Sequence, residues 1–268
     1  MEIIIDKNYH NSRIDRFLRE KFTIPQSLVA RLLREKKIKL NKKKVEPSTV
    51  LSLGDAIQVY YFLEENPQEV YVNPTLVEQF RSWITFEDED LIIINKPCGI
   101  SSQGGVTSGI SVDVLAKQYE TEARITHRLD RETSGIMIIA KNKYMARHVT
   151  QLFAQNLVKK KYYAMVERIT QPSGTISTNL HKDTHLQKMV ATEGNTCVTK
   201  FSAAGENIVL VEPQTGKMHQ IRLHLSHIGM PIVGDEKYGG IPAERMFLHA
   251  FSVEFDRHKF SADCTFVK

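Results

Sequence analysis

The stretch of sequence that decides the fold is His127-Arg128-Leu129-Asp130-Arg131-Glu132-Thr133-Ser134-Gly135, which continues into the apolar segment Ile136-Met137-Ile138-Ile139-Ala140. The apolar segment is rich in β-branched residues and predicts a buried strand. The polar segment before it predicts a loop, and loops on a rigid scaffold often carry functional groups. Asp130 lies between two arginines, whose charges favour an ionised carboxylate. Such a carboxylate can act as a nucleophile, although Arg-Asp pairs in loops are also common as structural ion pairs.

Residues 127–135 resemble the active-site motif of the RluA-type RNA pseudouridine synthases, which carry their catalytic aspartate within HRLD-x-x-TSG. Further segments resemble other elements of that family and occur in the same order: 94–99, 161–164, 216–224, 231–239 and 248–250. Together these elements cover most of residues 86–255. Lys217 replaces the usual arginine and Met230 stands where histidine is common, but neither departure touches the expected chemistry.

The resemblance implies an isomerase that converts uridine to pseudouridine in structured RNA. It implies that Asp130 is the nucleophile, that Tyr162 stacks on the uracil and assists proton loss, and that Arg222 binds the carboxylate or a phosphate. His127 and Arg128 are expected to contact the RNA where the target base leaves its stack. Because residues two apart in an extended segment face the same way, Arg128 is expected beside Asp130. The reaction gains and loses no atom, so no cofactor is expected, and first attack at the sugar or at the base stays open.

The positive charge of the chain is concentrated near its N-terminus. The 268 residues carry a net charge of +5, yet residues 31–44 hold eight basic residues and one acid, which leaves 28 bases and 30 acids elsewhere. Such a concentration favours a polyanionic partner, and RNA is the partner we expect. A dense charge run can also be no more than a solvated helix face.

The N-terminal pattern predicts two helices followed by short strands. Ser12 is expected to cap the first helix, and a second helix is expected to begin at Pro25 to Ser27. The pattern resembles the alpha-L RNA-binding module of bacterial ribosomal proteins, with Lys36-Lys37 where that module usually has a glycine. The resemblance and the charge run together suggest RNA contacts by five basic residues: Arg31, Arg34, Lys36, Lys37 and Lys39.

The chain is expected to form two domains. Prolines at 67 and 74 interrupt residues 62–82, which therefore predict a linker and a boundary near residue 80. Residues 1–80 would be a small α/β RNA-binding domain of the alpha-L type with its linker, and residues 81–268 the catalytic domain. The expected strands at 91–94, 135–140, 161–166, 175–179, 196–203 and 207–212, with helices between them, predict an α+β domain. Its sheet would be mixed but largely antiparallel with flanking helices, as in the pseudouridine synthase fold.

Other features argue against several classes of protein. No segment approaches the roughly 18 consecutive apolar residues of a membrane span, and the first residues do not predict a secretory signal. Cys98, Cys197 and Cys264 have neither zinc-ligand nor disulfide spacing, which favours the cytoplasm. The histidines at 181–185 and 219–227 lack metal-binding patterns, so no metal is expected. Nothing in the sequence demands more than a monomer.

Two alternative functions remain at this point. The chain would also suit a non-catalytic RNA-binding or ribosome-assembly protein with an inert catalytic domain. A glycosidic-bond hydrolase would need a second carboxylate as an acid, and Glu132 is the nearest candidate. The family resemblance favours the isomerase, and enzymes with both parts usually act on large-subunit ribosomal RNA.

Overall fold

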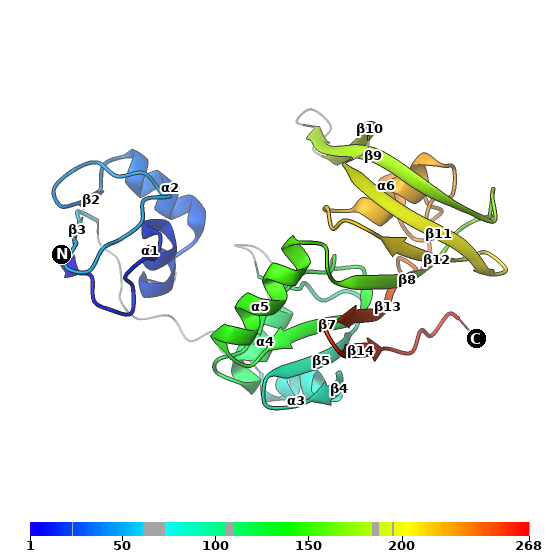
Figure 1. Cartoon of the computed structure of the whole chain (residues 1–268), viewed down its shortest axis with the longest axis horizontal. Helices are drawn as coiled ribbons and strands as arrows, with labels where there is room; N and C mark the ends of the chain where they lie inside the picture. The colour runs from blue at the N-terminus through cyan, green and yellow to red at the C-terminus, as the bar shows by residue number, and fades with distance from the viewer. Residues whose placement is uncertain (23, 62–72, 105–109, 184–187, 195, 268) are drawn as a thin grey trace. The chain divides into compact units, whose positions relative to one another are not determined.

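The structure consists of two compact units, Met1–Tyr71 and Val72–Lys268 (Figure 1). It is a computed structural model that describes residues 1–22, 24–61, 73–104, 110–183, 188–194 and 196–267. Residues 73–82, which the sequence assigned to a linker, form helix α3 (Pro74–Ser82) within the second unit. Asn73 caps this helix by accepting a hydrogen bond from the Thr75 N–H at 3.0 Å. Pro74 stands in the first turn, where its missing N–H is not needed, so this proline begins a helix and does not break one.

The N-terminal unit pairs two helices with a three-stranded antiparallel sheet of order β1-β3-β2. Its elements are β1 (Glu2–Ile4), α1 (Ile14–Phe22), α2 (Gln26–Arg34), β2 (Ile38–Leu40) and β3 (Ala56–Val59). Both predicted helices are confirmed, but the prediction that Ser12 caps α1 is wrong. The Ile14 and Asp15 N–H groups donate to the carbonyls of Thr49 (2.8 Å) and Pro47 (3.2 Å), so backbone groups satisfy the start of the helix.

Helix α2 ends in a left-handed turn at Lys36. The Lys36 N–H donates to the Leu33 carbonyl at 3.1 Å, and the Lys37 N–H donates to the Leu32 carbonyl at 2.9 Å. These two bonds form a Schellman motif, in which the residue after the helix adopts a positive φ and is usually glycine. Lys36 has a φ of 59°. The geometry therefore explains why a glycine is usual at this turn in the alpha-L module.

The second unit is built on one mixed sheet of order β10-β9-β11-β12-β8-β13-β7-β5-β4, with β6 and β14 added beside β7 and β13. The strands are β4 (Ile84–Glu87), β5 (Leu91–Lys96), β6 (Arg124–Ile125), β7 (Ser134–Ala140), β8 (Lys159–Met165), β9 (Ser173–Asp183), β10 (Lys188–Glu193), β11 (Cys197–Gly205), β12 (Ile208–Pro213), β13 (Leu248–Phe255) and β14 (His258–Ser261). Only β7 and β13 pair in parallel among the described strands. The predicted α+β class with a largely antiparallel mixed sheet is confirmed.

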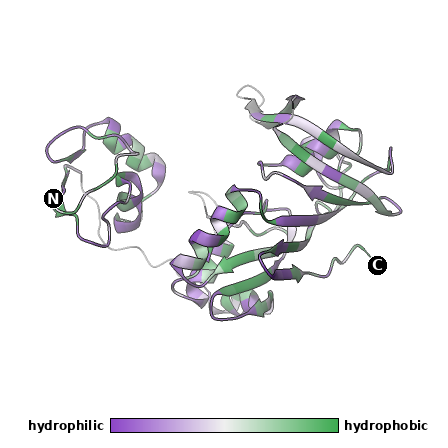
Figure 2. Cartoon of the chain, in the orientation of Figure 1, coloured by the Kyte–Doolittle hydropathy of each residue, from purple (hydrophilic) through white to green (hydrophobic). Residues whose placement is uncertain are grey.

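Helices cover both faces of the apolar strands β5 and β7. On one face, Ile94 and Met137 pack with α3 and α4 (Val112–Tyr119), and on the other, Ile93 and Ile138 pack with α5 (Lys143–Ala154). This double cover explains the continuous apolar runs, which Figure 2 shows as the greenest strands of the sheet. Helix α6 (Gln220–His227) packs on β8 and β12, and a short 3-10 helix, η1 (Glu236–Tyr238), follows it. None of the helices in the described ranges is long and apolar enough to span a membrane.

Strand β13 joins the two halves of the sheet, because it lies between β7 and β8. Its register sets Ala250 opposite Gly135 on β7 and opposite Tyr162 on β8. Gly135 has a φ of 112°, and a Cβ atom there would lie 2.3 Å from the Ala250 carbonyl oxygen. Only glycine fits at that position, so the last residue of the 127–135 motif lets the strands approach. The pairing fixes the loop before β7 relative to β8.

Candidate active site

Asp130 lies in the loop between β6 and β7, and the backbone on both sides of it is held in place. The Ser102 hydroxyl donates to the Leu129 carbonyl at 2.6 Å and accepts from the Leu129 N–H at 2.9 Å. After the aspartate, the Arg131 carbonyl accepts a bond from the Gly99 N–H at 2.9 Å. The loop is therefore rigid, as the sequence predicts for a segment that presents a reactive group.

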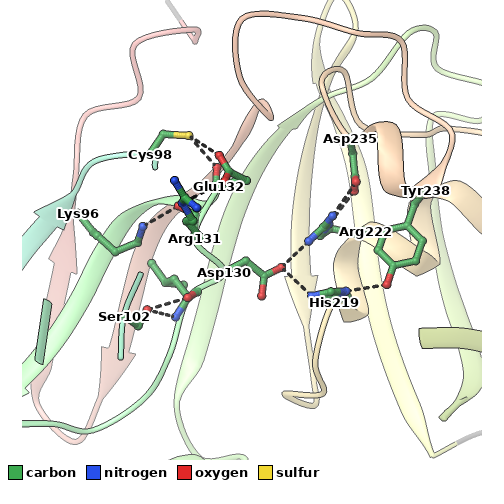
Figure 3. A network of polar contacts seen from close by, with 11 residues as sticks. Lys96, Cys98, Ser102, Asp130, Arg131, Glu132, His219, Arg222, Asp235 and Tyr238 are labelled. Carbon is green, nitrogen blue, oxygen red and sulfur yellow. Dashed lines mark hydrogen bonds and ion pairs between the residues drawn. The ribbon is translucent and has the colours of Figure 1, made fainter. Parts of the chain in front are cut away.

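A buried lysine adds a further tie to this loop. Lys96 is fully buried, and its ammonium donates to the carbonyls of Pro97 (2.9 Å) and Ile100 (2.8 Å). It also donates to the carbonyl of Arg131 at 3.2 Å (Figure 3). Burial lowers the pKa of Lys96 to about 8. Three carbonyl acceptors compensate the charge, so Lys96 fastens the turn after β5 to the residue that follows Asp130.

The Asp130 carboxylate opens into a groove of about 900 Å³. Tyr162 and Arg222, the two other residues predicted to be catalytic, line the same groove, as do His127 and Arg128. These residues come from the loop before β7, from β8 and from α6, and the fold brings them together. The Asp130 side chain is 28% exposed, so it is held by neighbours but open to a ligand.

Arg222 is the arginine that pairs with Asp130. Its Nη1 lies 3.0 Å from Asp130 Oδ2, while Nε and Nη2 each donate to Asp235 at 2.7 Å (Figure 3). Burial opposes the charge of Arg222, but the hydrogen bonds and charges of Asp235 and then Asp130 outweigh it and raise the pKa of Arg222. Asp235 thus fixes the guanidinium plane and leaves one nitrogen for Asp130. Among the described residues, no hydrogen bond or ion pair reaches the second oxygen, Oδ1.

His219 lines the groove beside the carboxylate, and Tyr238 supports it from behind through a hydrogen bond. His219 has a φ of 57°, a strained value for a residue other than glycine, and this turn directs its ring between Asp130 and Tyr238. Its Nδ1 lies 2.6 Å from the Tyr238 hydroxyl, and its Nε2 lies 3.8 Å from Asp130 Oδ2, which is too long for a hydrogen bond. Burial lowers the pKa of His219, so the ring is neutral near pH 7. The Tyr238 ring also stacks under the Arg222 guanidinium at 4.9 Å.

Tyr162 is half-buried on β8 and packs against the apolar clusters on both sides of the strand. Burial, and then the charge of Asp130, raise the pKa of Tyr162, so its hydroxyl keeps its proton at neutral pH. The neighbouring Tyr163 faces the other way and packs on Phe251, with ring centroids 4.8 Å apart. The strand therefore separates a groove tyrosine from a packing tyrosine.

Arg128 and Asp130 both line the groove, but in the described parts of the chain no ion pair or hydrogen bond joins them. Arg128 is exposed, and in the described parts of the chain the ion pair of Asp130 is with Arg222. Arg131 turns away, with its Nε donating to the Gly99 carbonyl at 2.9 Å.

His127 is part of the groove wall, but it carries no charge there. Its Nε2 accepts a hydrogen bond from the Ile138 N–H at 3.0 Å, and its ring stacks on Phe153 with centroids 4.4 Å apart. Burial, and then the charge of Lys160, lower the pKa of His127 to about 3. The predicted phosphate contact therefore cannot come from a positive imidazole, although the Nδ1–H of this tautomer remains a donor.

The five basic residues predicted to bind RNA belong to the N-terminal unit. Arg31, Arg34, Lys36 and Lys37 are exposed, and Lys39 lies with its ammonium 5.2 Å from the centroid of the Tyr60 ring. The buried face of α2 carries Val29, Leu32 and Leu33, so the helix separates an apolar side from a basic side. A basic stripe beside an exposed aromatic ring is suited to a nucleic-acid backbone.

Reasoning from the sequence missed Asp235, Lys96 and Ser102, and it treated His219 only as a surface histidine. Asp235 and His219 stand within the family-like segments 231–239 and 216–224, which was the available signal. The position of His224 is explained without a metal, since its ring lies between the hydroxyls of Thr178 (2.9 Å) and Thr199 (2.8 Å). Within the ranges that the structure describes, no group of three or more potential ligands is placed to hold a metal ion.

Two solved human proteins have a similar fold. RNA Pseudouridylate Synthase Domain Containing 4 matches with a TM-score of 0.57 and 26% identity, over 72% of this chain and 92% of the human chain. RNA Pseudouridylate Synthase Domain Containing 1 matches with a TM-score of 0.56 and 25% identity, over 75% of this chain and 86% of the human chain. The mixed sheet and the groove around Asp130 thus define an enzyme of the pseudouridine synthase class.

The sequence comparisons give the family. Residues 90–227 match the RNA pseudouridylate synthase family, and residues 1–57 match the N-terminal domain of the ribosomal pseudouridine synthase RluD. The ribosomal large subunit pseudouridine synthase C of Haemophilus influenzae is 32% identical over 96% of this chain and 87% of its own length. The enzyme of the same name from Vibrio cholerae is 32% identical over 94% of this chain and 88% of its own. This chain belongs to the RNA pseudouridylate synthase family, and it is an RNA pseudouridine synthase.

Proposed function

We propose that this enzyme isomerises specific uridines of large-subunit ribosomal RNA, with Asp130 as the nucleophile. The observation that carries the proposal is the pairing of Asp130 with Arg222 at 3.0 Å inside a groove of about 900 Å³. The names of the Haemophilus and Vibrio relatives, which match along nearly the whole chain, support this choice of RNA.

The geometry of the carboxylate supports the nucleophilic role. Arg222 holds one oxygen, while Oδ1 has no hydrogen-bond or ion-pair partner among the described residues, and Asp130 lines the groove. Such an oxygen is free to form a temporary bond with an extruded nucleotide, either at the sugar or at the uracil ring. After the base has rotated and carbon 5 has joined the sugar, Asp130 leaves unchanged, so the isomerisation itself calls for no redox cofactor.

Tyr162 and Arg128 receive separate roles in this proposal. The Tyr162 ring would stack on the uracil, and its protonated hydroxyl would assist the loss of the carbon 5 proton through a hydrogen bond or a water. Arg128 is exposed on the groove, so it would contact the RNA at the place that the flipped base leaves. The neutral His127 would contribute only one hydrogen-bond donor, its Nδ1–H, at this wall of the groove.

The N-terminal unit would hold the RNA without taking part in the chemistry. Its exposed Arg31, Arg34, Lys36 and Lys37, together with Lys39, would bind phosphates by releasing counterions. The enzyme would act as a monomer, since nothing in the sequence demands more, and a ribosomal substrate fits the cytoplasmic location predicted from the sequence.

The two alternatives have weaker support. A hydrolase would need Glu132 as a partner acid, but this side chain points toward Cys98 and lies 3.6 Å from the Arg131 Nε, while Asp130 points toward Arg222 (Figure 3). An inert RNA-binding protein would not need the Asp130-Arg222-Asp235 array. No observation favours either alternative over isomerisation.

The test is pseudouridine mapping of ribosomal RNA from cells with and without the gene. We expect the signal at defined large-subunit positions to disappear on deletion and to return with the wild-type gene but not with Asp130→Asn. The Asp130→Asn protein should still bind the RNA with nearly normal affinity. A signal restored by Asp130→Asn would remove this residue from the mechanism, and free uracil released from RNA would favour hydrolysis.

A further inference from the structure

Lys160 is a half-buried cation of the groove wall whose role is not explained by the chemistry above. It lies on β8 two residues before Tyr162, and the two side chains face the same way because residues alternate along a strand. Lys160 lines the groove together with Asp130, and it also lines a small cavity of about 10 Å³ behind Tyr162. Its position places a positive charge next to the tyrosine on which the uracil would stack.

The two neighbouring lysines provide a comparison within the same strand. Lys159 and Lys161 face the opposite way, where Lys159 pairs with Glu254 at 2.7 Å and Lys161 pairs with Glu212 at 3.5 Å. In the ranges described by the structure, neither an ion pair nor a hydrogen bond reaches the Lys160 ammonium. Of these three lysines, Lys160 points into the groove, and it is the one that has no carboxylate partner among the described residues.

The apolar surroundings of Lys160 make it energetically unfavourable for its ammonium to have no counter-ion. The cavity behind Tyr162 is lined by the rings of His127 and Phe153 and by apolar strand residues. Burial lowers the pKa of Lys160, because these neighbours do not solvate an ammonium. A desolvated charge without a counter-ion destabilises the free protein, so an anion supplied by the substrate would relieve that cost.

We infer that Lys160 binds a backbone phosphate of the RNA beside the extruded nucleotide. The phosphodiester is the anionic group of RNA, whereas a uracil carbonyl would leave the buried charge only partly compensated. The neutral His127 on the same wall has its Nδ1–H available as a second donor to the same phosphate. The inference rests on the proposed function, since it assumes that the groove receives a flipped nucleotide.

The test compares three variants of Lys160 in the full-length enzyme. The probe is large-subunit ribosomal RNA transcribed in vitro, and the measurements are RNA affinity at several salt concentrations and single-turnover pseudouridine formation. Lys160→Met and Lys160→Gln remove the charge by different side chains, and Lys160→Arg keeps it. Lys159→Met serves as the matched control, because it removes an equal charge from the outer face of the same strand.

We expect Lys160→Met and Lys160→Gln to weaken binding roughly 10-fold at moderate salt. The slope of log affinity against log salt should become shallower by about 0.7 to 0.9, the value for one lost phosphate contact. Lys160→Arg and Lys159→Met should keep the wild-type slope, and Lys160→Met should melt no lower than the wild type.

Equal slopes for the wild type, Lys160→Met and Lys160→Gln would overturn the inference. A loss of turnover with an unchanged slope would also overturn it, because the ammonium would then serve an uncharged group such as a base carbonyl. A wild-type enzyme that binds this RNA but forms no pseudouridine would contradict the proposed substrate, and the slopes would still decide whether Lys160 meets a phosphate.

Discussion

Arg222 divides its guanidinium between two carboxylates with different surroundings. Asp235 is buried and takes two of the nitrogens at 2.7 Å, whereas Asp130 is partly open and takes the third at 3.0 Å. The buried partner therefore sets the position of the arginine, and the arginine in turn sets one oxygen of the nucleophile. Asp235 acts through Arg222 and is a positioning residue.

This division predicts the effect of Asp235→Asn. One hydrogen bond of the bidentate pair is lost and a buried charge is left without its partner, so the guanidinium should shift away from Asp130. We expect kcat to fall on the order of 100-fold with KM nearly unchanged, and the free energy of unfolding to fall by about 3 kcal/mol. Single-turnover kinetics well below the melting temperature separate the two effects.

The control for Asp235→Asn is Glu254→Gln, which removes the exposed partner of Lys159. Exposed ion pairs contribute little, so this variant should keep both kcat and stability. If Asp235→Asn retained full kcat, Asp130 would not need the arginine in its present orientation.

His127 predicts a pH dependence of stability. Its pKa is about 3 in the folded protein, while an unfolded histidine titrates near its model value of 6.5. As the pH falls through 6.5, the unfolded chain gains a proton that the folded chain does not, so stability is lost on the acid side. From pH 7.5 to pH 5 this group alone should cost about 2 kcal/mol.

Urea unfolding of the wild type and of His127→Gln at these two pH values checks this prediction. Glutamine keeps an acceptor for the Ile138 N–H but does not titrate, so the variant should lose about 2 kcal/mol less than the wild type over this range. The other histidines cancel in the comparison. Parallel pH curves would mean that His127 has the same protonation in both states.

At the scale of the elements, the end of α2 combines a strained backbone with a functional charge. Lys36 adopts the left-handed conformation that closes the Schellman motif, and its side chain is exposed among the basic residues of the N-terminal unit. A glycine would relax the backbone but remove a charge from the proposed RNA-binding surface. Lys36 therefore adds a positive charge to the proposed RNA-binding surface but lowers the stability of the turn that ends α2.

We expect Lys36→Gly to stabilise α2 by about 1 kcal/mol and to weaken RNA binding slightly. Lys37→Gly is the matched control, because Lys37 is not among the residues of positive φ and glycine there should destabilise by up to about 1 kcal/mol. Hydrogen exchange of the α1 and α2 amides in the full-length protein measures both changes. Equal effects of the two substitutions would contradict the strain at Lys36.

Most elements were predictable from the sequence because their side-chain patterns are unambiguous. The continuous burial of the apolar strands β5 and β7 follows from local rules, as does the Asn142 cap of α5, which accepts a hydrogen bond from the Met145 N–H at 2.8 Å. The start of α1 was misjudged because its N–H groups are satisfied by residues more than 30 positions away in the sequence. The helix at 74–82 was missed because proline both ends helices and begins them.

At the scale of the whole molecule, three segments distant in sequence meet at one carboxylate. The sequence motifs named Asp130, Tyr162 and Arg222, but Arg222 and Asp130 are 92 residues apart and their contact depends on the sheet order. The same dependence explains why the role of Asp235 could not be predicted from the sequence. Local spacing identifies which residues can react, whereas the sheet decides which of them face one another.

The separation of charge between the two units predicts separate effects on binding and on catalysis. Replacing Lys36, Lys37 and Lys39 by alanine should weaken RNA binding and flatten its salt dependence by up to about 0.7 to 0.9 per lost phosphate contact. The rate at saturating RNA should change little, because these residues lie outside the unit that contains Asp130. Binding isotherms at several salt concentrations and single-turnover rates at saturating RNA measure the two effects.

The control replaces three exposed bases of the second unit that stand outside the groove, Lys143, Arg257 and Lys259. This variant carries the same net charge as the first, so it should reproduce any effect of total charge alone. A basic face that is merely solvated would leave both triple variants with the same affinity.

The place of β13 in the sheet has a consequence for how the enzyme folds during translation. Among the described strands, the one that carries Tyr162 and the one that follows Asp130 do not pair with each other, and β13 at Leu248–Phe255 lies between them and pairs with both. During translation, both flanking strands leave the ribosome long before this last one. The catalytic centre can therefore assemble only after β13 has been made, and translation products that end before Leu248 lack the strand that assembles it.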